Sequence, residues 1–203
     1  MTRIKICGFT RADDINYAIE LGVSYLGFIF HEASPRYITP EKVAQFKKDL
    51  NIQIPLVGVF VNKNPAEMLN TAQKANIDII QAHGNETIED LAQLNQFEVW
   101  KVHRLVEESD LNSLKVFKQY LALIDSPSRE WGGSGILSNW DLAKKAAELT
   151  PLILAGGIGP KNIQEAIQNV KPYGVDISSG VESKPGVKDH NKLKALFEQA
   201  KEL

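Results

Sequence analysis

The stretch MTRIKICGFTRADDINYAIELGVSYLGFIF, residues 1–30, indicates the fold class of this chain. An apolar, β-branched run at Arg3–Cys7 is followed by an amphipathic stretch with helical spacing at Asp13–Leu21 and a second apolar run at Ser24–Phe30. Continuous apolar strands that alternate with helices indicate a parallel sheet covered by helices, because a strand buried on both faces shows no polar alternation. We therefore predict a β–α–β unit here.

The same unit recurs along the whole sequence, eight times in all. The predicted strands are Arg3–Cys7, Ser24–Phe30, Pro55–Val61, Ile77–Gln81, Glu98–His103, Tyr120–Ile124, Pro151–Ala155 and Gly174–Ile177. The predicted helices are Asp13–Leu21, Pro40–Leu50, Pro65–Asn76, Ile88–Leu94, Leu111–Phe117, Trp140–Leu149, Lys161–Asn169 and His190–Glu202. Three helix starts are marked by a polar residue or glycine followed by proline, at Thr39-Pro40, Asn64-Pro65 and Gly159-Pro160.

Eight strand–helix units predict an α/β fold, a closed (β/α)₈ TIM barrel, as a single domain over residues 1–203. The repeat averages about 25 residues, which is short for this fold and predicts lean loops. A doubly wound open sheet has the same local pattern, and strand order is not readable from one sequence. The count of eight favours the barrel.

Composition limits the partners and the compartment. With 43% apolar residues and a net charge of −2, the chain can fill a core and shows no basic excess for nucleic acid. Its single cysteine, Cys7, can form no intrachain disulfide, which favours a reducing compartment. No apolar run near residue 1 is long enough for a signal peptide or a membrane span. We expect a cytoplasmic protein with no membrane partner.

The residues at the end of each predicted strand are the candidates for the active site, because TIM barrels place their catalytic residues at the carboxyl ends of the strands. These residues are polar or rich in glycine: Cys7-Gly8, His31 through Arg36, Asn62, Gln81 through Gly84, His103-Arg104, Asp125-Ser126, Gly156-Gly157 and Ser178-Ser179-Gly180.

Two glycine clusters follow the last two strands, ILAGGIGP with Gly156 and Gly157, and VDISSGVE with Ser178, Ser179 and Gly180. Glycine-rich turns expose backbone N–H groups, so these five residues are the predicted phosphate-binding site. A third cluster, EWGGSG, follows strand six and would close over a ligand as a flexible loop. The alternative is that all three are short turns of a compact barrel.

Two side chains can carry acid–base chemistry. Cys7 ends the first strand, where a thiolate would act as base or nucleophile, although a lone cysteine is more often a small buried hydrophobe. Lys5 lies two residues before Cys7, on the same face of the predicted strand, and its ammonium group would lower the pKa of the thiol if the two side chains are in contact. Asp125 closes strand six, where a desolvated carboxyl group would act as an acid. Alternatively, Asp125 begins a turn with Ser126 and Pro127.

Other polar residues indicate binding. The forked guanidinium of Arg36 matches a carboxylate, unless it is a solvated surface arginine. Asp176 suits a sugar hydroxyl or a backbone amide. His31, His83 and His103 follow strands but form no local pair at metal-ligand spacing, so we expect no metal. Without nucleotide-binding or serine-hydrolase motifs, the sequence predicts a cofactor-free acid–base enzyme acting on a small phosphorylated molecule.

A set of motifs spans nearly the whole chain: KICGFT at 5–10, GFIFHEASPRYI at 27–38, VGVFVN at 57–62, QAHG at 81–84, LIDS at 123–126, GGSG at 132–135, LAGGI at 154–158 and GVDISSGVESKPGVKD at 174–189. Together and in this order they resemble the phosphoribosylanthranilate isomerases of tryptophan biosynthesis. The opening KICG, the later SPRYI and the closing DISSGVESKPGVKD form a specific combination.

The resemblance implies an Amadori rearrangement of N-(5′-phosphoribosyl)anthranilate to 1-(2-carboxyphenylamino)-1-deoxyribulose 5-phosphate without metal or cofactor. By similarity, Asp125 would be the general acid and Cys7 the general base. Arg36 would bind the anthranilate carboxylate, and the two glycine clusters would bind the phosphate. His83 and Asp176 would contact the substrate, with no step assigned to either.

The sequence departs from the family pattern at Ala82, where a bulkier apolar residue is usual, and at GGSG with the following Leu137–Trp140 segment. Two other functions stay open. One is an isomerase of a histidine-pathway aminosugar, or a dual-substrate enzyme that accepts both aminosugars, against which Cys7 argues. The other is a barrel that only binds its ligand. The oligomeric state, monomer or homodimer, is also open.

Overall fold

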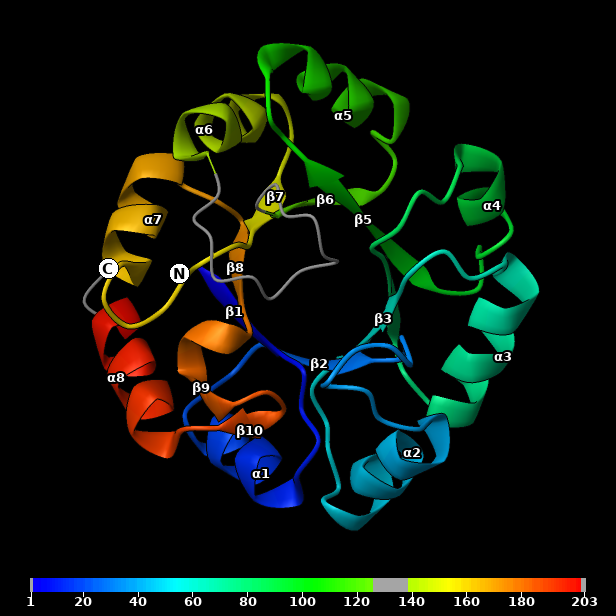
Figure 1. Cartoon of the computed structure of the whole chain (residues 1–203), viewed down its shortest axis with the longest axis vertical. Coiled ribbons are helices and arrows are strands. Elements are labelled where there is room, and N and C mark those ends of the chain that lie inside the picture. Colours follow the sequence, from blue (N-terminus) through cyan, green and yellow to red (C-terminus); the bar gives the residue numbers. More distant parts are fainter. Residues whose placement is uncertain (1, 126–138, 202–203) are drawn as a thin grey trace.

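The computed structural model describes residues 2–125 and 139–201, which form a closed parallel barrel surrounded by helices (Figure 1). The strands follow one another around the barrel in sequence order, β1 to β8, and β1 pairs with both β2 and β8. The (β/α)₈ prediction is therefore confirmed. The open-sheet alternative is wrong, because an open sheet would leave β1 or β8 at an edge.

The predicted strands and helices are all present, with ends shifted by at most a few residues. The barrel strands are β1 (Arg3–Cys7), β2 (Tyr25–Ile29), β3 (Leu56–Phe60), β4 (Ile79–Ala82), β5 (Glu98–Arg104), β6 (Leu121–Asp125), β7 (Leu152–Leu154) and β8 (Gly174–Ile177). The helices are α1 (Ala12–Glu20), α2 (Pro40–Asp49), α3 (Pro65–Ala75), α4 (Ile88–Ala92), α5 (Asn112–Val116), α6 (Trp140–Leu149), α7 (Ile163–Val170) and α8 (His190–Lys201).

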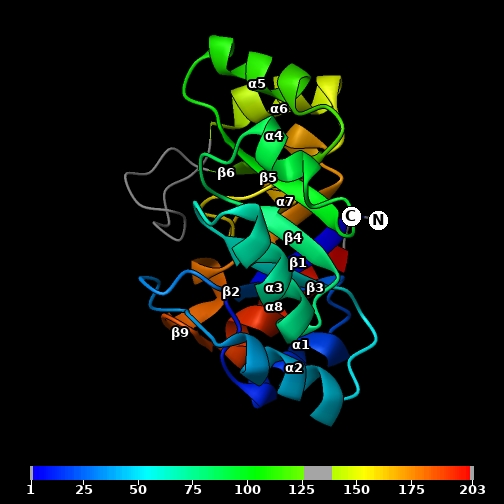
Figure 2. The same ribbon diagram turned by 90° about the vertical axis from the view of Figure 1, so that its right-hand side faces the viewer.

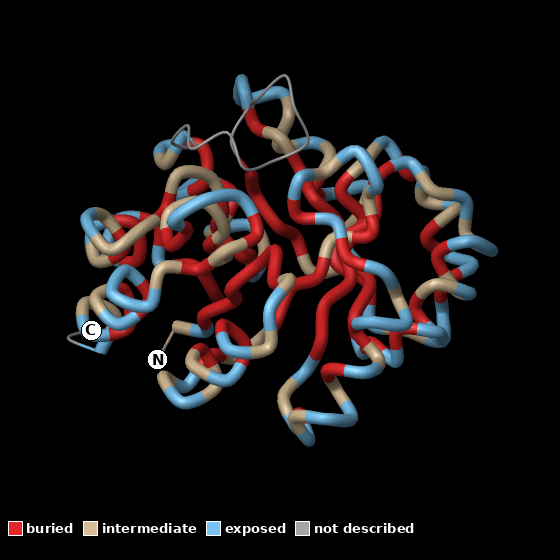
Figure 3. The backbone as a smooth tube through the Cα atoms, turned by 60° about the horizontal axis from the view of Figure 1, so that its bottom comes forward, coloured by how far each residue is buried: buried red, intermediate tan, exposed pale blue. Residues whose placement is uncertain are grey.

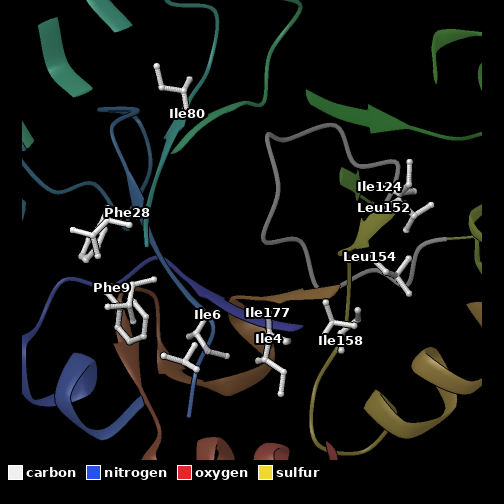
Figure 4. Close-up of a cluster of buried hydrophobic side chains, with 14 of the residues drawn as sticks. Ile4, Ile6, Phe9, Phe28, Ile80, Ile124, Leu152, Leu154, Ile158 and Ile177 are labelled. Carbon is white, nitrogen blue, oxygen red and sulfur yellow. The ribbon is translucent and has the colours of Figure 1, made fainter. Parts of the chain in front are cut away.

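Alternation along the strands divides the apolar side chains between two cores. One set fills the barrel interior and consists of Val57, Ile79, Trp100, Val102, Leu123, Ile153 and Ala155. The larger set lies between the strands and the helices, and Figure 4 shows part of it, including Ile4, Ile6, Phe28 and Ile177. Figure 3 shows the result, a buried barrel inside helices whose outer faces are exposed.

Helix starts follow the predicted caps at two of three positions. The side chains of Thr39 and Asn64 accept hydrogen bonds from backbone N–H groups in the first turns of α2 and α3. The prediction for α7 was two residues early. Its first helical residue is Ile163, because Asn162 instead bonds the preceding loop, accepting from Gly159 N at 2.8 Å and donating to Gly157 O at 3.0 Å.

A short segment after β8 was not predicted. It contains the 3₁₀ turn η2 (Ser179–Val181) and an antiparallel pair, β9 (Glu182–Lys184) and β10 (Val187–Lys188). Another 3₁₀ turn, η1 (Glu108–Leu111), precedes α5. The β9–β10 pair is a sheet of its own, and in the side view β9 lies apart from the barrel strands (Figure 2). Within the described residues, the helices are all too short or too polar to cross a membrane.

The barrel core predicts a measurable cost for truncating Leu123, which is fully buried in the interior set. Leu123→Ala should lower the free energy of unfolding by about 3 kcal/mol, because a cavity adds to the lost burial. Urea unfolding followed by circular dichroism measures this. Leu149→Ala, at a site 58% exposed, is the control and should cost less than about 0.5 kcal/mol. Equal costs would contradict the assignment of Leu123 to a packed interior.

Candidate active site at the carboxyl ends of the strands

The Cys7 thiol lies inside the barrel against β2. A Cβ atom added to Gly27 would be 2.7 Å from Cys7 Sγ, so the thiol occupies the space that any larger residue at position 27 would fill. Burial raises the pKa of the Cys7 thiol above its ordinary value of 9.0, although the ammonium groups of Lys5 and Lys188 oppose this shift. The expected effect of Lys5 is thus present, but it does not lower the thiol pKa overall.

Lys5 and Asp176 form a buried ion pair beside this thiol. Register places Lys5 opposite Asp176, and Lys5 Nζ lies 2.8 Å from Asp176 Oδ2. Burial alone would lower the pKa of Lys5, but Asp176 and Cys7 together outweigh it and the pKa is raised. Within the described part of the chain, the second oxygen of Asp176, Oδ1, is buried without a hydrogen-bond partner. A ligand hydroxyl group would satisfy it.

Asp125 lies at the carboxyl end of β6, close to His83, which follows β4. Asp125 Oδ2 is 3.2 Å from His83 Nε2, and both side chains are buried. Gln81 Nε2 lies 3.2 Å from His83 Nδ1 on the other side of the ring. When the Gln81 amide donates to Nδ1, that nitrogen carries no proton, so the ring N–H is on Nε2, which faces Asp125. The structure therefore brings His83 and Asp125 together.

Arg36 is buried rather than solvated. Its Nε and Nη2 atoms donate to the Glu182 carboxylate at distances of 2.8 to 3.1 Å. A Cβ atom added to Gly8 would be 2.7 Å from Arg36 Cδ, so the arginine lies against the residue that follows Cys7. Lys188 Nζ is 2.9 Å from Glu182 and also donates to the Cys7 carbonyl oxygen. The carboxylate-binding candidate thus lies beside the candidate base.

The two predicted phosphate loops touch one another. A Cβ atom added to Gly180 would be 2.0 Å from the carbonyl oxygen of Ile158, so glycine is required for this approach. Gly156 and Gly157 have φ values of +89° and +65°, which favour glycine. Ser178 Oγ is buried and has no hydrogen-bond partner among the described residues. Backbone and hydroxyl groups of both loops are therefore gathered in one place.

Some candidates are not part of this arrangement. His103 packs outside the barrel against α5, with Nδ1 2.9 Å from Ser113 Oγ, and burial lowers its pKa to about 4. The loop EWGGSG lies outside the described residues. In the ranges 2–125 and 139–201, no three His, Cys, Asp or Glu side chains are placed to hold a metal ion.

Sequence reasoning missed the roles of Glu182 and Lys188. Both are almost fully buried charged residues on the β9–β10 pair. The sequence pattern that could have indicated them is the charged residues on both sides of the Pro185-Gly186 turn, which comes directly after a predicted phosphate loop. Their partners, Arg36 and Cys7, are more than a hundred residues away in sequence.

The thiol environment predicts an unusual titration. Cys7 is the single cysteine, so its alkylation by iodoacetamide, followed by mass spectrometry, reports its thiolate fraction. The midpoint should lie above pH 9.0, because burial raises the thiol pKa. Asp176→Asn removes a negative charge that raises this pKa, so its midpoint should be lower than that of the unmodified chain. A midpoint below 9.0 in the unmodified chain would contradict the burial argument.

Comparisons with known proteins identify the family. The family model for N-(5′-phosphoribosyl)anthranilate isomerase matches residues 4–199. The isomerase of Geobacter sulfurreducens is 42% identical over 202 residues, which cover 99% of each chain. Crystallised monomers of the dimeric Thermotoga maritima isomerase share 34% identity over the full length of both chains, with a TM-score of 0.90. A complex of such an isomerase with reduced 1-(o-carboxyphenylamino)-1-deoxyribulose 5-phosphate also covers both chains fully, at 34% identity and a TM-score of 0.90.

These matches cover the whole barrel, including every residue of the candidate site, and several exceed 30% identity at full coverage. The alternative of a barrel that only binds its ligand is therefore wrong. The chain belongs to the N-(5′-phosphoribosyl)anthranilate isomerase family of tryptophan biosynthesis.

Proposed function

We propose that this chain converts N-(5′-phosphoribosyl)anthranilate into 1-(2-carboxyphenylamino)-1-deoxyribulose 5-phosphate, with Asp125 as general acid and Cys7 as general base. The observation that carries the proposal is the pairing of two proton-transfer groups at the barrel mouth. Cys7 ends β1 and Asp125 ends β6, three strands apart around the closed barrel, and both side chains are buried. A substrate between them would meet a base and an acid from different sides.

The chemistry requires only proton transfers. Asp125 donates a proton to the ribose ring oxygen as the bond from C1′ to that oxygen breaks, which gives an open-chain Schiff base. The Cys7 thiolate then removes the proton from C2′ and leaves an enolamine, which tautomerises to the ketone. The raised pKa of the thiol makes its thiolate a stronger base. The rearrangement is redox-neutral overall and the two side chains supply its acid and its base, so the proposal needs no metal and no cofactor.

Substrate orientation depends on two anionic ends. Arg36 binds the anthranilate carboxylate, since among the described residues Glu182 takes two of the five N–H groups of its guanidinium and the other three have no partner there. The phosphate binds at the other end to the backbone and hydroxyl groups of Gly156, Gly157, Ser178, Ser179 and Gly180. Two fixed ends hold the reacting carbons between acid and base.

Asp176 and His83 act on the sugar between these ends. The buried Oδ1 of Asp176 accepts a hydrogen bond from a ribose hydroxyl group, while Oδ2 stays paired with Lys5. His83 contacts the substrate beside Asp125, with its ring held by Gln81. Neither residue is assigned a proton-transfer step.

Substitution of the acid or the base should abolish most activity. Cys7→Ala and Asp125→Asn should each lower kcat about 10²–10⁴-fold, because each removes one positioned proton-transfer group. The loss of anthranilate-type fluorescence from freshly generated substrate measures the rate. Asp13→Asn, at a side chain 79% exposed, is the matched control and should keep full activity. Full activity of Cys7→Ala, or turnover of a histidine-pathway aminosugar in place of this substrate, would contradict the proposal.

The proposal extends to a homodimer in the cytoplasm. The Thermotoga maritima relative is dimeric, and the single cysteine of this chain suits a reducing compartment. Sedimentation equilibrium should therefore give twice the chain mass of 22.6 kDa. A mass of one chain at tens of micromolar protein would contradict the dimer and leave the monomer, the other state left open by the sequence.

A further inference from the structure

The β9–β10 pair places two charged side chains in the protein interior. Glu182 and Lys188 are register partners, and only 6% and 3% of their surfaces are exposed. Buried charges are costly unless they are paired and hydrogen-bonded, so such a pair needs an explanation. Neither residue has a proton-transfer or ligand-binding role in the proposed reaction.

Glu182 is the centre of a buried cluster of charges. Its carboxylate accepts from Arg36 Nε at 3.0 and 3.1 Å, from Arg36 Nη2 at 2.8 Å, and from Lys188 Nζ at 2.9 Å. The backbone N–H of Gly186 adds a bond of 3.2 Å. Burial would raise the pKa of Glu182, but the Arg36 and Lys188 contacts outweigh it and hold the pKa below its ordinary value of 4.5. The carboxylate is therefore ionised at neutral pH.

The same cluster reaches the main chain of the proposed base. Lys188 Nζ donates to the Cys7 carbonyl oxygen, and the Arg36 side chain lies against Gly8. Glu182 thereby ties the guanidinium of Arg36 to the end of β1 through Lys188. The distance between the carboxylate-binding group and the base is set by these contacts.

The cluster also contains more basic than acidic side chains around Glu182. Two basic side chains, Arg36 and Lys188, share the Glu182 carboxylate, and burial lowers the pKa of Lys188 although Glu182 opposes this shift. Glu182 occupies the Nε side of the guanidinium, and it is the only described side chain to which Arg36 donates. The remaining N–H groups match a second carboxylate in charge and geometry.

We propose that Glu182 is a positioning residue that determines specificity for the anthranilate carboxylate. It holds the Nε side of Arg36 so that the other N–H groups of the guanidinium meet the substrate carboxylate at a fixed distance from Cys7. Glu182 itself touches neither the substrate nor the reacting atoms. This inference rests on the proposed role of Arg36, and the experiment below separates the two.

The test compares two substrates, N-(5′-phosphoribosyl)anthranilate and N-(5′-phosphoribosyl)aniline, which lacks the carboxylate. Glu182→Gln should raise KM for the first substrate about 10–100-fold, with a smaller change in kcat, because Arg36 loses its fixed orientation. For the aniline compound, kcat/KM should change less than about twofold. Glu198→Gln, at a side chain 61% exposed, is the matched control and should change neither value.

Further variants separate the possible outcomes. Arg36→Met should remove the preference for the anthranilate compound, and adding Glu182→Gln to it should have little further effect. If Arg36→Met keeps the preference, the proposed role of Arg36 fails. The positioning role of Glu182 is overturned if Arg36→Met loses the preference for the anthranilate compound while Glu182→Gln keeps it. It is also overturned if Glu182→Gln slows the reaction of both substrates equally. If Glu182→Gln does not fold, Glu182→Asp replaces it in the test because it keeps the negative charge. The preference of this variant for the anthranilate compound should also fall, by a smaller factor.

Discussion

The parallel pairing of β1 with β8 is the constraint on which the site depends. It closes the barrel and sets Lys5 opposite Asp176, although 171 positions separate them in sequence. The same closure brings the segment after β8 to the end of β1, where Lys188 reaches the Cys7 carbonyl oxygen and Ser178 lies near Gly8. The thiol, its neighbouring ion pair and one of the two proposed phosphate loops are therefore brought together by a single strand pairing.

Buried polar side chains around the barrel mouth lie in contact with one another. Lys5 pairs with Asp176, both Arg36 and Lys188 pair with Glu182, and His83 lies against Asp125. Such pairs contribute little net stability, because the loss of hydration offsets much of their attraction. Their value lies in orientation, since a preorganised group does not have to reorganise during the reaction.

The fold could be predicted from the sequence because its signals are local. The run Arg3–Cys7 and its seven counterparts are apolar and β-branched, and their number implied a closed barrel. Cys7 and Asp125 could be selected because each ends a strand, and Arg36 because it lies in the loop after β2. Glu182 and Lys188 could not, since their burial depends on partners distant in sequence. The net direction of the thiol pKa was equally hidden, because it depends on how burial compares with the charge of Lys5.

The most direct test of the account is a crystal structure of this chain with the reduced form of 1-(o-carboxyphenylamino)-1-deoxyribulose 5-phosphate, the molecule bound in a related isomerase. The account predicts its carboxylate about 3 Å from the Arg36 guanidinium and its phosphate at the loops of Gly157 and Gly180. Its sugar carbons would then lie between Cys7 Sγ and the Asp125 carboxyl group. A ligand bound with its carboxylate at the glycine loops, or with Cys7 out of reach of C2′, would contradict the account.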